Sequence, residues 1–188
     1  MSHAEFVHLH LHTQFSLLDG AIRLGELFQK AKEYRLPALA VTDHGAMFGA
    51  IEFYQQAKKN GIRPIIGCEV YVAPGSRFDK TAKGPAESSY HLILLAENLE
   101  GYRNLMRLVS KAYSEGFYYR PRVDKEILEE HNAGLIALTA CLQGEVPFHL
   151  AAGDAKKALK AADELRSIFP GRLYLELQEN RIPEQKKA

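Results

Sequence analysis

Hydrophobic residues recur along the chain with two different periods. A two-residue alternation or a short apolar run predicts a strand, and a spacing of three to four residues predicts a helix. Strands are predicted over 6–12, 38–42, 63–72, 89–96, 134–141 and 172–179. Helices are predicted over 24–34, 48–60, 99–113 and 154–169, and loops over 73–87 and 116–124. The chain therefore alternates between strands and helices from end to end.

The helices can be assigned apolar stripes from the same spacing. The first helix places Leu24, Leu27, Phe28, Ala31 and Tyr34 on one face. The stripe of the second consists of Phe48, Ile51, Tyr54 and Ala57. The stripe of the third consists of Tyr102, Leu105, Met106 and Val109. We expect these stripes to pack on the sheet.

Strands that alternate with helices predict a parallel α/β sheet, because parallel neighbours need a long crossover connection. Such a sheet is either open and doubly wound or closed as a barrel. Residues suited to metal binding follow several different predicted strands. A barrel gathers the carboxyl ends of all its strands around one opening, whereas an open sheet spreads them along an edge. One shared site therefore favours a barrel.

Metal-binding residue types concentrate near the N-terminus. His8, His10 and His12 alternate with aliphatic residues, so a strand would project all three imidazoles from one face. Neighbouring imidazoles repel when protonated and need partners when buried. Asp43 and His44 follow the predicted strand over 38–42 in a similar arrangement. A cluster of divalent metal ions is the simplest explanation of both patterns.

Composition narrows the class of protein. The 188 residues suit one domain with a substantial core. The chain has 24 Lys and Arg against 23 Asp and Glu, so it has no basic excess to hold nucleic acid by charge alone. It has neither a membrane-length apolar run nor a signal-peptide pattern, and its two cysteines make no disulfide framework. We expect a cytoplasmic protein without membrane contact.

The motifs, taken in order, resemble the PHP (polymerase and histidinol phosphatase) superfamily. The markers are His10-Leu-His-Thr13 with Ser16 and Asp19-Gly20, Thr42-Asp-His-Gly45, Gly67-Cys-Glu-Val-Tyr71, His91-Leu92 and Thr139-Ala-Cys-Leu-Gln-Gly-Glu145. Two further segments resemble the branch found at the N-terminus of bacterial DNA polymerase III alpha subunits. They are Gly116-Phe-Tyr-Tyr-Arg-Pro-Arg122 and Leu175-Glu-Leu-Gln-Glu179.

The resemblance implies a distorted TIM-like (β/α)7 barrel, of which residues 1–188 would supply about six of the seven strands. It also implies two to three divalent metal ions, with zinc expected first and manganese or iron possible. The implied ligands are His10, His12, Asp19, His44, Glu69, His91 and Cys141. The family completes its site with an Asp-x-His motif on a later strand. None occurs before residue 188, so we expect the natural chain to continue through one.

Several other residues receive different expectations. Glu69 would bridge two metal ions, Cys141 would bind as a terminal thiolate, and Asp43 would orient the ligands. His8 lies before the family motif, so a packing role in the bottom layer of the barrel is expected. A separate group mixes aromatic rings with cations, a pattern that can stack bases and hold phosphate or simply pin a loop. It consists of Tyr118, Tyr119, Arg120 and Arg122.

Three functions follow from the resemblance. The leading hypothesis is a metal-dependent phosphoesterase, specifically a 3′–5′ exonuclease, within a DNA-directed DNA polymerase whose polymerase active site lies outside this chain. Its partners would be DNA and other subunits of the replicative holoenzyme, including a proofreading exonuclease subunit. The second is a stand-alone phosphatase for a small phosphomonoester such as histidinol phosphate. The third is a metal-stabilised structural module without catalysis.

Overall fold

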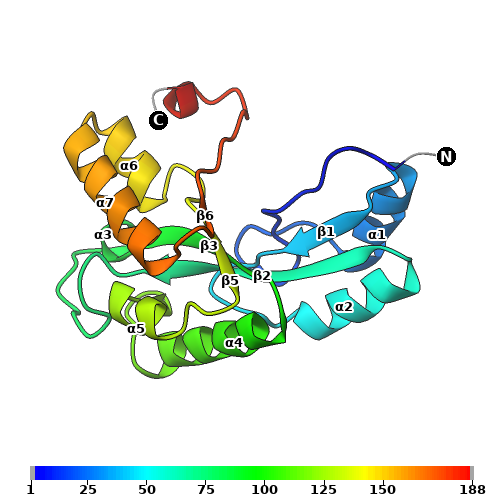
Figure 1. Ribbon diagram of the computed structural model, residues 1–188, viewed down its shortest axis with the longest axis horizontal. Coiled ribbons are helices and arrows are strands. Elements are labelled where there is room, and N and C mark those ends of the chain that lie inside the picture. The colour runs from blue at the N-terminus through cyan, green and yellow to red at the C-terminus, as the bar shows by residue number, and fades with distance from the viewer. Residues whose placement is uncertain (1–2, 187–188) are drawn as a thin grey trace.

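A single mixed sheet with helices on both sides forms the framework of the protein (Figure 1). The computed structural model describes residues 3–186, apart from the side chains at positions 85 and 86. The strands are β1 (Ala38–Val41), β2 (Arg63–Val72), β3 (Tyr90–Ala96), β4 (Arg122–Val123), β5 (Leu135–Leu138) and β6 (Leu173–Tyr174). The helices are α1 (Leu24–Glu33), α2 (Ala50–Lys59), α3 (Pro85–Ser88), α4 (Leu99–Ser114), α5 (Lys125–Glu130), α6 (Glu145–Ala151), α7 (Ala155–Ile168) and the 3₁₀ helix η1 (Pro183–Lys186).

The sheet has the order β1-β2-β3-β5-β6, and β4 pairs separately with β2. The prediction of an all-parallel sheet is wrong at β3, which runs antiparallel to both β2 and β5. The reason lies in the connection over 73–89, which contains only the four-residue α3. Without a crossover helix, β3 returns beside β2 in the opposite direction. The pairs β1–β2 and β5–β6 are parallel, as predicted for their elements. β2 also pairs in parallel with β4, a two-residue strand inside the loop predicted over 116–124.

Side chains of β3 pack on both faces of the sheet. Leu92 and Leu94 belong to a core cluster shared with β2, β5, α4, α5 and α7. Ile93 and Leu95 face the other way, into a smaller cluster with β1 and β5. A third cluster joins β1 to α1 and α2. Burial on both faces explains why the strand is continuously apolar instead of alternating.

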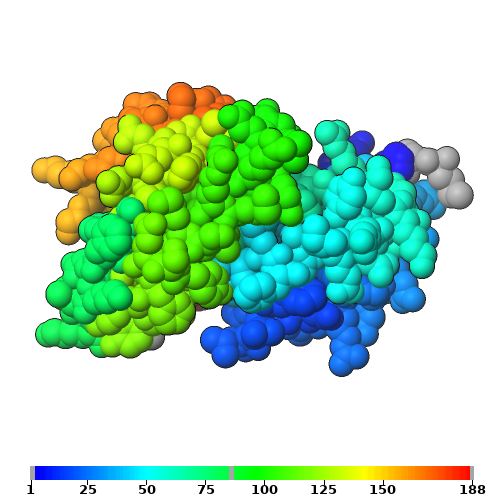
Figure 2. Space-filling view, turned by 90° about the horizontal axis from the view of Figure 1, so that it is seen from below, coloured from blue at the N-terminus to red at the C-terminus, as the bar shows by residue number. Residues whose placement is uncertain are grey.

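The apolar stripe predicted for α2 is wrong. Phe48, Ile51 and Tyr54 are exposed, while Ala50 and Phe53 are buried against the sheet with Ala57. Both sets satisfy helical spacing, and the choice between them is made by contact with α1, whose Phe28 packs on Phe53. In the third predicted helix Leu105 is buried as expected, but Met106 is exposed. The exposed faces of α2 and α4 lie side by side on one surface of the molecule (Figure 2).

The first predicted strand, over 6–12, is not a strand in the structure. The segment is extended and lies along β1, with hydrogen bonds from Ala40 N to His8 O (3.0 Å) and from Thr42 N to Leu11 O (2.9 Å). These bonds position the segment without forming a regular ladder. The packing role expected for His8 is also wrong, because its side chain is exposed and contacts the ring of Phe6.

The last predicted strand, over 172–179, is reduced to the two residues of β6. Within residues 3–186, β6 does not pair with β1, and a groove of about 970 Å³ lies between these two edges of the sheet. The edges nevertheless approach at one end, where His10 Nδ1 lies 2.7 Å from Glu176 Oε1. The sheet is therefore curled in the manner of a barrel. No helix in the described part of the chain is long and apolar enough to cross a membrane.

Arg122 is almost fully buried, at 2% exposure, at the start of β4. Its guanidinium donates hydrogen bonds to four backbone carbonyls, those of Arg77, Asp79, Ser88 and Gly116. Of the two roles left open for Arg122, nucleic-acid contact and the pinning of a loop, this burial contradicts the first and fits the second. Its donors are satisfied inside the protein, where they hold the long 73–89 connection against the loop before β4.

Replacing Arg122 by methionine should destabilise the chain by about 3 kcal/mol or more, because buried carbonyls lose their donors and regain no water. Urea unfolding followed by circular dichroism measures this change. Arg103→Met, on the exposed face of α4, is the control and should change the free energy of unfolding by no more than about 0.5 kcal/mol. Equal midpoints for Arg122→Met and the unmodified chain would contradict the assigned role.

Candidate metal centre

Four segments place polar side chains at one end of the sheet. Glu69 lies on β2 and His91 on β3, where the antiparallel register sets His91 opposite Tyr71. His44 follows β1 and forms an isolated parallel bridge with Glu69. The extended segment along β1 supplies His10 and, two residues later, His12. The predicted convergence of separate strand ends on one site is thus present in the structure.

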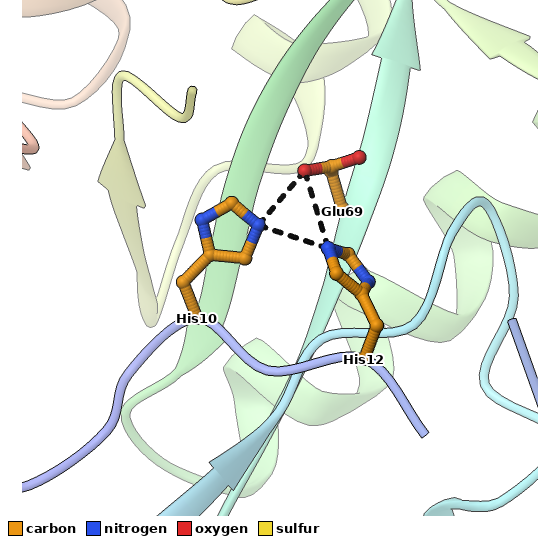
Figure 3. A group of neighbouring side chains, drawn as sticks. All are labelled: His10, His12 and Glu69. Atoms are coloured by element: carbon orange, nitrogen blue, oxygen red, sulfur yellow. Dashed lines mark hydrogen bonds and ion pairs between the residues drawn. The ribbon is translucent and has the colours of Figure 1, made fainter. Parts of the chain in front are cut away.

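Glu69 is the centre of the group and is 1% exposed. Its Oε2 lies 3.0 Å from His10 Nε2 and 3.8 Å from His12 Nε2 (Figure 3). Its Oε1 lies 2.6 Å from His44 Nδ1 and 2.7 Å from His91 Nδ1. Despite these short distances, neither carboxylate oxygen has a partner with hydrogen-bond geometry among residues 3–186. Each oxygen thus faces a pair of imidazoles without being satisfied by them.

The donor atoms fit divalent metal ions. Two groups have ligand atoms within 4.8 Å of one another, namely His10, His12 and Glu69, and His44, Glu69 and His91. Imidazole and carboxylate donors suit zinc, and also manganese or iron. Glu69 belongs to both groups, so one carboxylate could bind one cation on each side. A cation would also compensate two buried oxygens that have no other partner.

The imidazoles and Glu69 shift one another's pKa values. Burial opposes ionisation of Glu69, but the close imidazoles of His10, His44 and His91 hold the pKa of Glu69 well below its usual range. Burial also disfavours protonated His10, yet its contacts with Glu176 and Glu69 raise the pKa of His10 to about 9. Glu69 is therefore carboxylate, the form that binds metal.

Glu176, which follows β6, is a site residue that sequence reasoning missed. It contacts His10 Nδ1 at 2.7 Å, and Gln178 donates to it at 2.7 Å. A proton on Nδ1 would leave Nε2 of His10 free to face Glu69, as in carboxylate–histidine–metal arrangements. The sequence signal for Glu176 is the Leu175-Glu-Leu-Gln-Glu179 motif, which supports the family resemblance but indicates no role for any single residue.

Asp19 and Cys141 flank the centre without joining either group of three. Asp19 Oδ2 lies 3.1 Å from His44 Nε2, and its side chain is 63% exposed. Cys141 Sγ lies 3.9 Å from His91 Nδ1, and burial raises the pKa of its thiol. Both residues are close enough to extend the ligand set, and their roles as ligands remain predictions.

Asp43 is buried, and its carboxylate is bonded to Thr13 and Ser16. Its carboxylate accepts hydrogen bonds from Thr13 N at 2.6 Å, from Thr13 Oγ1 at 2.9 Å and from Ser16 Oγ at 2.8 Å. Ser16 Oγ in turn accepts from the backbone N of His44 at 3.1 Å. Asp43 therefore ties the segment that carries His10 and His12 to the turn that carries His44. This position agrees with the orienting role expected for it.

The aromatic and basic loop before β4 divides by position. Tyr118 donates its hydroxyl to Ala82 O at 2.9 Å, and Tyr119 is exposed. Arg120 Nη1 lies 3.3 Å from His91 Nε2, and the guanidinium lies 4.7 Å from the centre of the Tyr71 ring. Of the residues predicted to contact nucleic acid, Arg120 is thus the one beside the candidate metal centre.

The fold and this group of side chains define a PHP domain. The model of that family matches residues 8–180, and the chain belongs to the PHP domain family.

Within the family, the chain is similar to part of DNA polymerase III subunit alpha. It is 51% identical to that subunit from Aquifex aeolicus over 189 residues, covering 98% of this chain and 16% of that protein. It is 52% identical to the subunit from Thermus aquaticus over 190 residues, covering 100% of this chain and 16% of that protein. The chain therefore spans about a sixth of the length of these relatives.

A solved structure from Bifidobacterium adolescentis, provisionally described as a metal-dependent phosphoesterase, is also similar. It has a TM-score of 0.41 and 19% identity, with 59% of this chain and 34% of that chain covered. This partial likeness carries no functional argument.

Asp43→Asn should weaken metal binding roughly 10- to 100-fold, because the side chain loses its negative charge and its amide nitrogen cannot accept from Thr13 Oγ1 as Oδ2 does. Competition with a chromogenic chelator measures the affinity. Asp163→Asn, an exposed change on α7, is the control. Unchanged affinity for Asp43→Asn would show that the histidine segments are held in place without it.

His44→Ala should lower the metal content and the melting temperature of the metal-loaded protein, because one ligand group loses a donor. His8→Ala should change neither, since its imidazole is exposed and outside both groups. Elemental analysis and thermal melting with and without EDTA measure both quantities. Loss of metal from His8→Ala would contradict the assigned ligand set.

Proposed function

We propose that this PHP domain is a metal-dependent phosphoesterase. The observation that carries the proposal is the buried Glu69 carboxylate, which faces a pair of imidazoles from each of its two oxygens. Two cations bound at such a carboxylate can clamp the attacking and leaving oxygens of a phosphoryl centre and lower the pKa of a bound water. Hydrolysis by this route needs no protein nucleophile.

The chain's own residues would divide the work. Two cations would be held by the residues of the two ligand groups, namely His10, His12, His44, Glu69 and His91. Asp19, beside His44, and Cys141, beside His91, could contribute to a third. Glu176 would fix the ring orientation of His10, and Asp43 would hold the loop between His12 and His44. The donor set favours zinc, with manganese or iron as alternatives.

The similarity to DNA polymerase III alpha subunits supports a 3′–5′ exonuclease as the specific activity. The physiological substrate would be the 3′ end of DNA, and the polymerase active site would lie outside these 188 residues. We further propose that the partners are DNA and the other subunits of a replicative holoenzyme, including a proofreading exonuclease subunit, in the cytoplasm. The length of the relatives weighs against a stand-alone phosphatase.

A second function, a metal-stabilised brace, is favoured by one observation. The contact between His10 and Glu176 joins segments 166 residues apart and brings the two edges of the sheet together. Metal bound at His10 would therefore also stabilise the curled sheet. The same residues serve both functions, so only turnover separates the phosphoesterase from the brace.

The metal-loaded, full-length protein should release nucleotides from the 3′ end of a labelled oligonucleotide and hydrolyse p-nitrophenyl phosphate. Asp19→Asn should lower both rates at least about 10-fold, because the carboxylate beside His44 is a proposed metal ligand. Since the Asp19 side chain is exposed, the substitution should not disturb folding. Asp163→Asn is again the control. Absence of turnover with zinc, manganese and iron, together with metal-dependent melting, would support the brace and contradict the phosphoesterase.

A further inference from the structure

Arg120 stands at the rim of the candidate metal centre. Its guanidinium lies over the ring of Tyr71, and Tyr71 in turn stacks on His44 with ring centres 6.1 Å apart. The ring of His91 meets Tyr71 edge-on at 5.2 Å and lies 3.3 Å from Arg120 through its Nε2. The guanidinium of Arg120 thus contacts one proposed ligand, His91, directly. The ring of Tyr71 lies between it and a second proposed ligand, His44.

The loop that carries Arg120 is fixed on both sides. Before it, the hydroxyl of Tyr118 is bonded to Ala82 O, and Tyr118 N donates to Arg120 O at 3.0 Å. After it, Arg122 is held by four carbonyls. Between the two anchors Tyr119 adopts a positive φ of 58°, which is unfavourable for a bulky residue. Strain of this kind persists where the surroundings impose it, and the next residue is Arg120, whose Nη1 lies 3.3 Å from His91 Nε2.

The turn after β1 is fitted to the same loop. Gly45 has a φ of +59°, and a Cβ at this position would lie 2.9 Å from Tyr71 Cε2 and 2.9 Å from Pro121 Cγ. Only glycine therefore lets the turn that carries His44 pack directly against the residue after Arg120. This packing holds the segment that carries Arg120 against the turn that carries His44.

Within the described residues, the positive charge of Arg120 has no carboxylate partner. Among residues 3–186 no carboxylate oxygen lies within 4.0 Å of it, whereas Arg77 is paired with Glu115, Asp124 and Glu126. Cations bound at the neighbouring imidazoles would add further positive charge. A guanidinium held in such a place is stabilised by an anion, and its planar pair of N–H donors matches two oxygens of a phosphate.

We propose that Arg120 binds the phosphoryl group of the substrate beside the metal ions and so selects phosphoesters over uncharged esters. This inference rests on the proposed phosphoesterase site and adds to it a substrate-binding residue outside the ligand set. Arg120 would contact non-bridging oxygens, hold the phosphorus against the metal centre, and neutralise charge that grows as the leaving group departs.

The test compares Arg120→Gln and Arg120→Lys in the full-length, metal-loaded protein, with Arg103→Gln on α4 as the control. Calorimetric titration with inorganic phosphate should show an affinity for phosphate reduced at least about 10-fold in Arg120→Gln. The reduction should be smaller in Arg120→Lys, because lysine keeps the positive charge but lacks the paired N–H donors of the guanidinium. Metal content should not change in any variant. Where the protein turns over p-nitrophenyl phosphate, Arg120→Gln should raise KM in the same proportion.

The outcomes separate this inference from the proposed activity. Phosphate binding that weakens in Arg120→Gln supports the inference even if no substrate is hydrolysed, in which case only the phosphoesterase proposal fails. Phosphate affinity equal in Arg120→Gln and in the unmodified protein overturns the inference, even if hydrolysis occurs. Loss of metal from Arg120→Gln in step with loss of phosphate binding also overturns it, because Arg120 would then support the ligands and not the substrate.

Discussion

The structure depends on one buried carboxylate, that of Glu69. Placing a charged group in the interior is costly unless opposite charge compensates it. Four imidazoles from three separate segments surround its two oxygens, and their presence keeps Glu69 ionised despite burial. None of these imidazoles gives the oxygens a well-directed hydrogen bond. The arrangement is therefore one in which divalent cations could bind between the gathered side chains and compensate the carboxylate.

The fold follows from the need to bring these segments together. β2 carries Glu69, and its neighbours β1 and β3 deliver His44 and His91 to the same end of the sheet. The segment along β1 adds His10 and His12, and the chain after β6 reaches back with Glu176. The contact between His10 and Glu176 at this end of the sheet also joins its two edges. Stability and the proposed chemistry would depend on the same contacts, so we expect mutation of a proposed ligand to affect both.

Sequence alone predicted the parts of this structure that depend on local pattern. The long apolar β2 and the amphipathic α1, α4 and α7 lie where the periodicities placed them, and the motif residues His10, His12, His44, Glu69 and His91 meet at one site. Pattern could not predict the direction of β3, because a strand buried on both faces has the same composition whether it is parallel or antiparallel. Nor could it distinguish a strand over 6–12 from an extended segment, because alternation reports which face is buried and not which backbone groups are paired.

Contacts between residues distant in sequence account for the remaining differences. Glu176 belongs to the site through a contact across 166 residues, for which its own surroundings give no periodic signal. Arg120 and Arg122 look equivalent in the sequence, yet Arg120 lies beside His91 of the candidate metal centre and Arg122 is buried among carbonyls. Likewise the spacing of apolar residues on α2 allows two different buried faces. Contact with α1 decides between them, because it buries Phe53 and leaves Ile51 exposed.

The most direct test of the account is anomalous diffraction from crystals of the protein grown with zinc or manganese, recorded at the absorption edge of the metal. The account predicts metal peaks on both sides of the Glu69 carboxylate, one near His10 and His12 and one near His44 and His91. Crystals saturated with metal that show no peak at Glu69, with its oxygens bonded only to imidazole N–H groups, would contradict it.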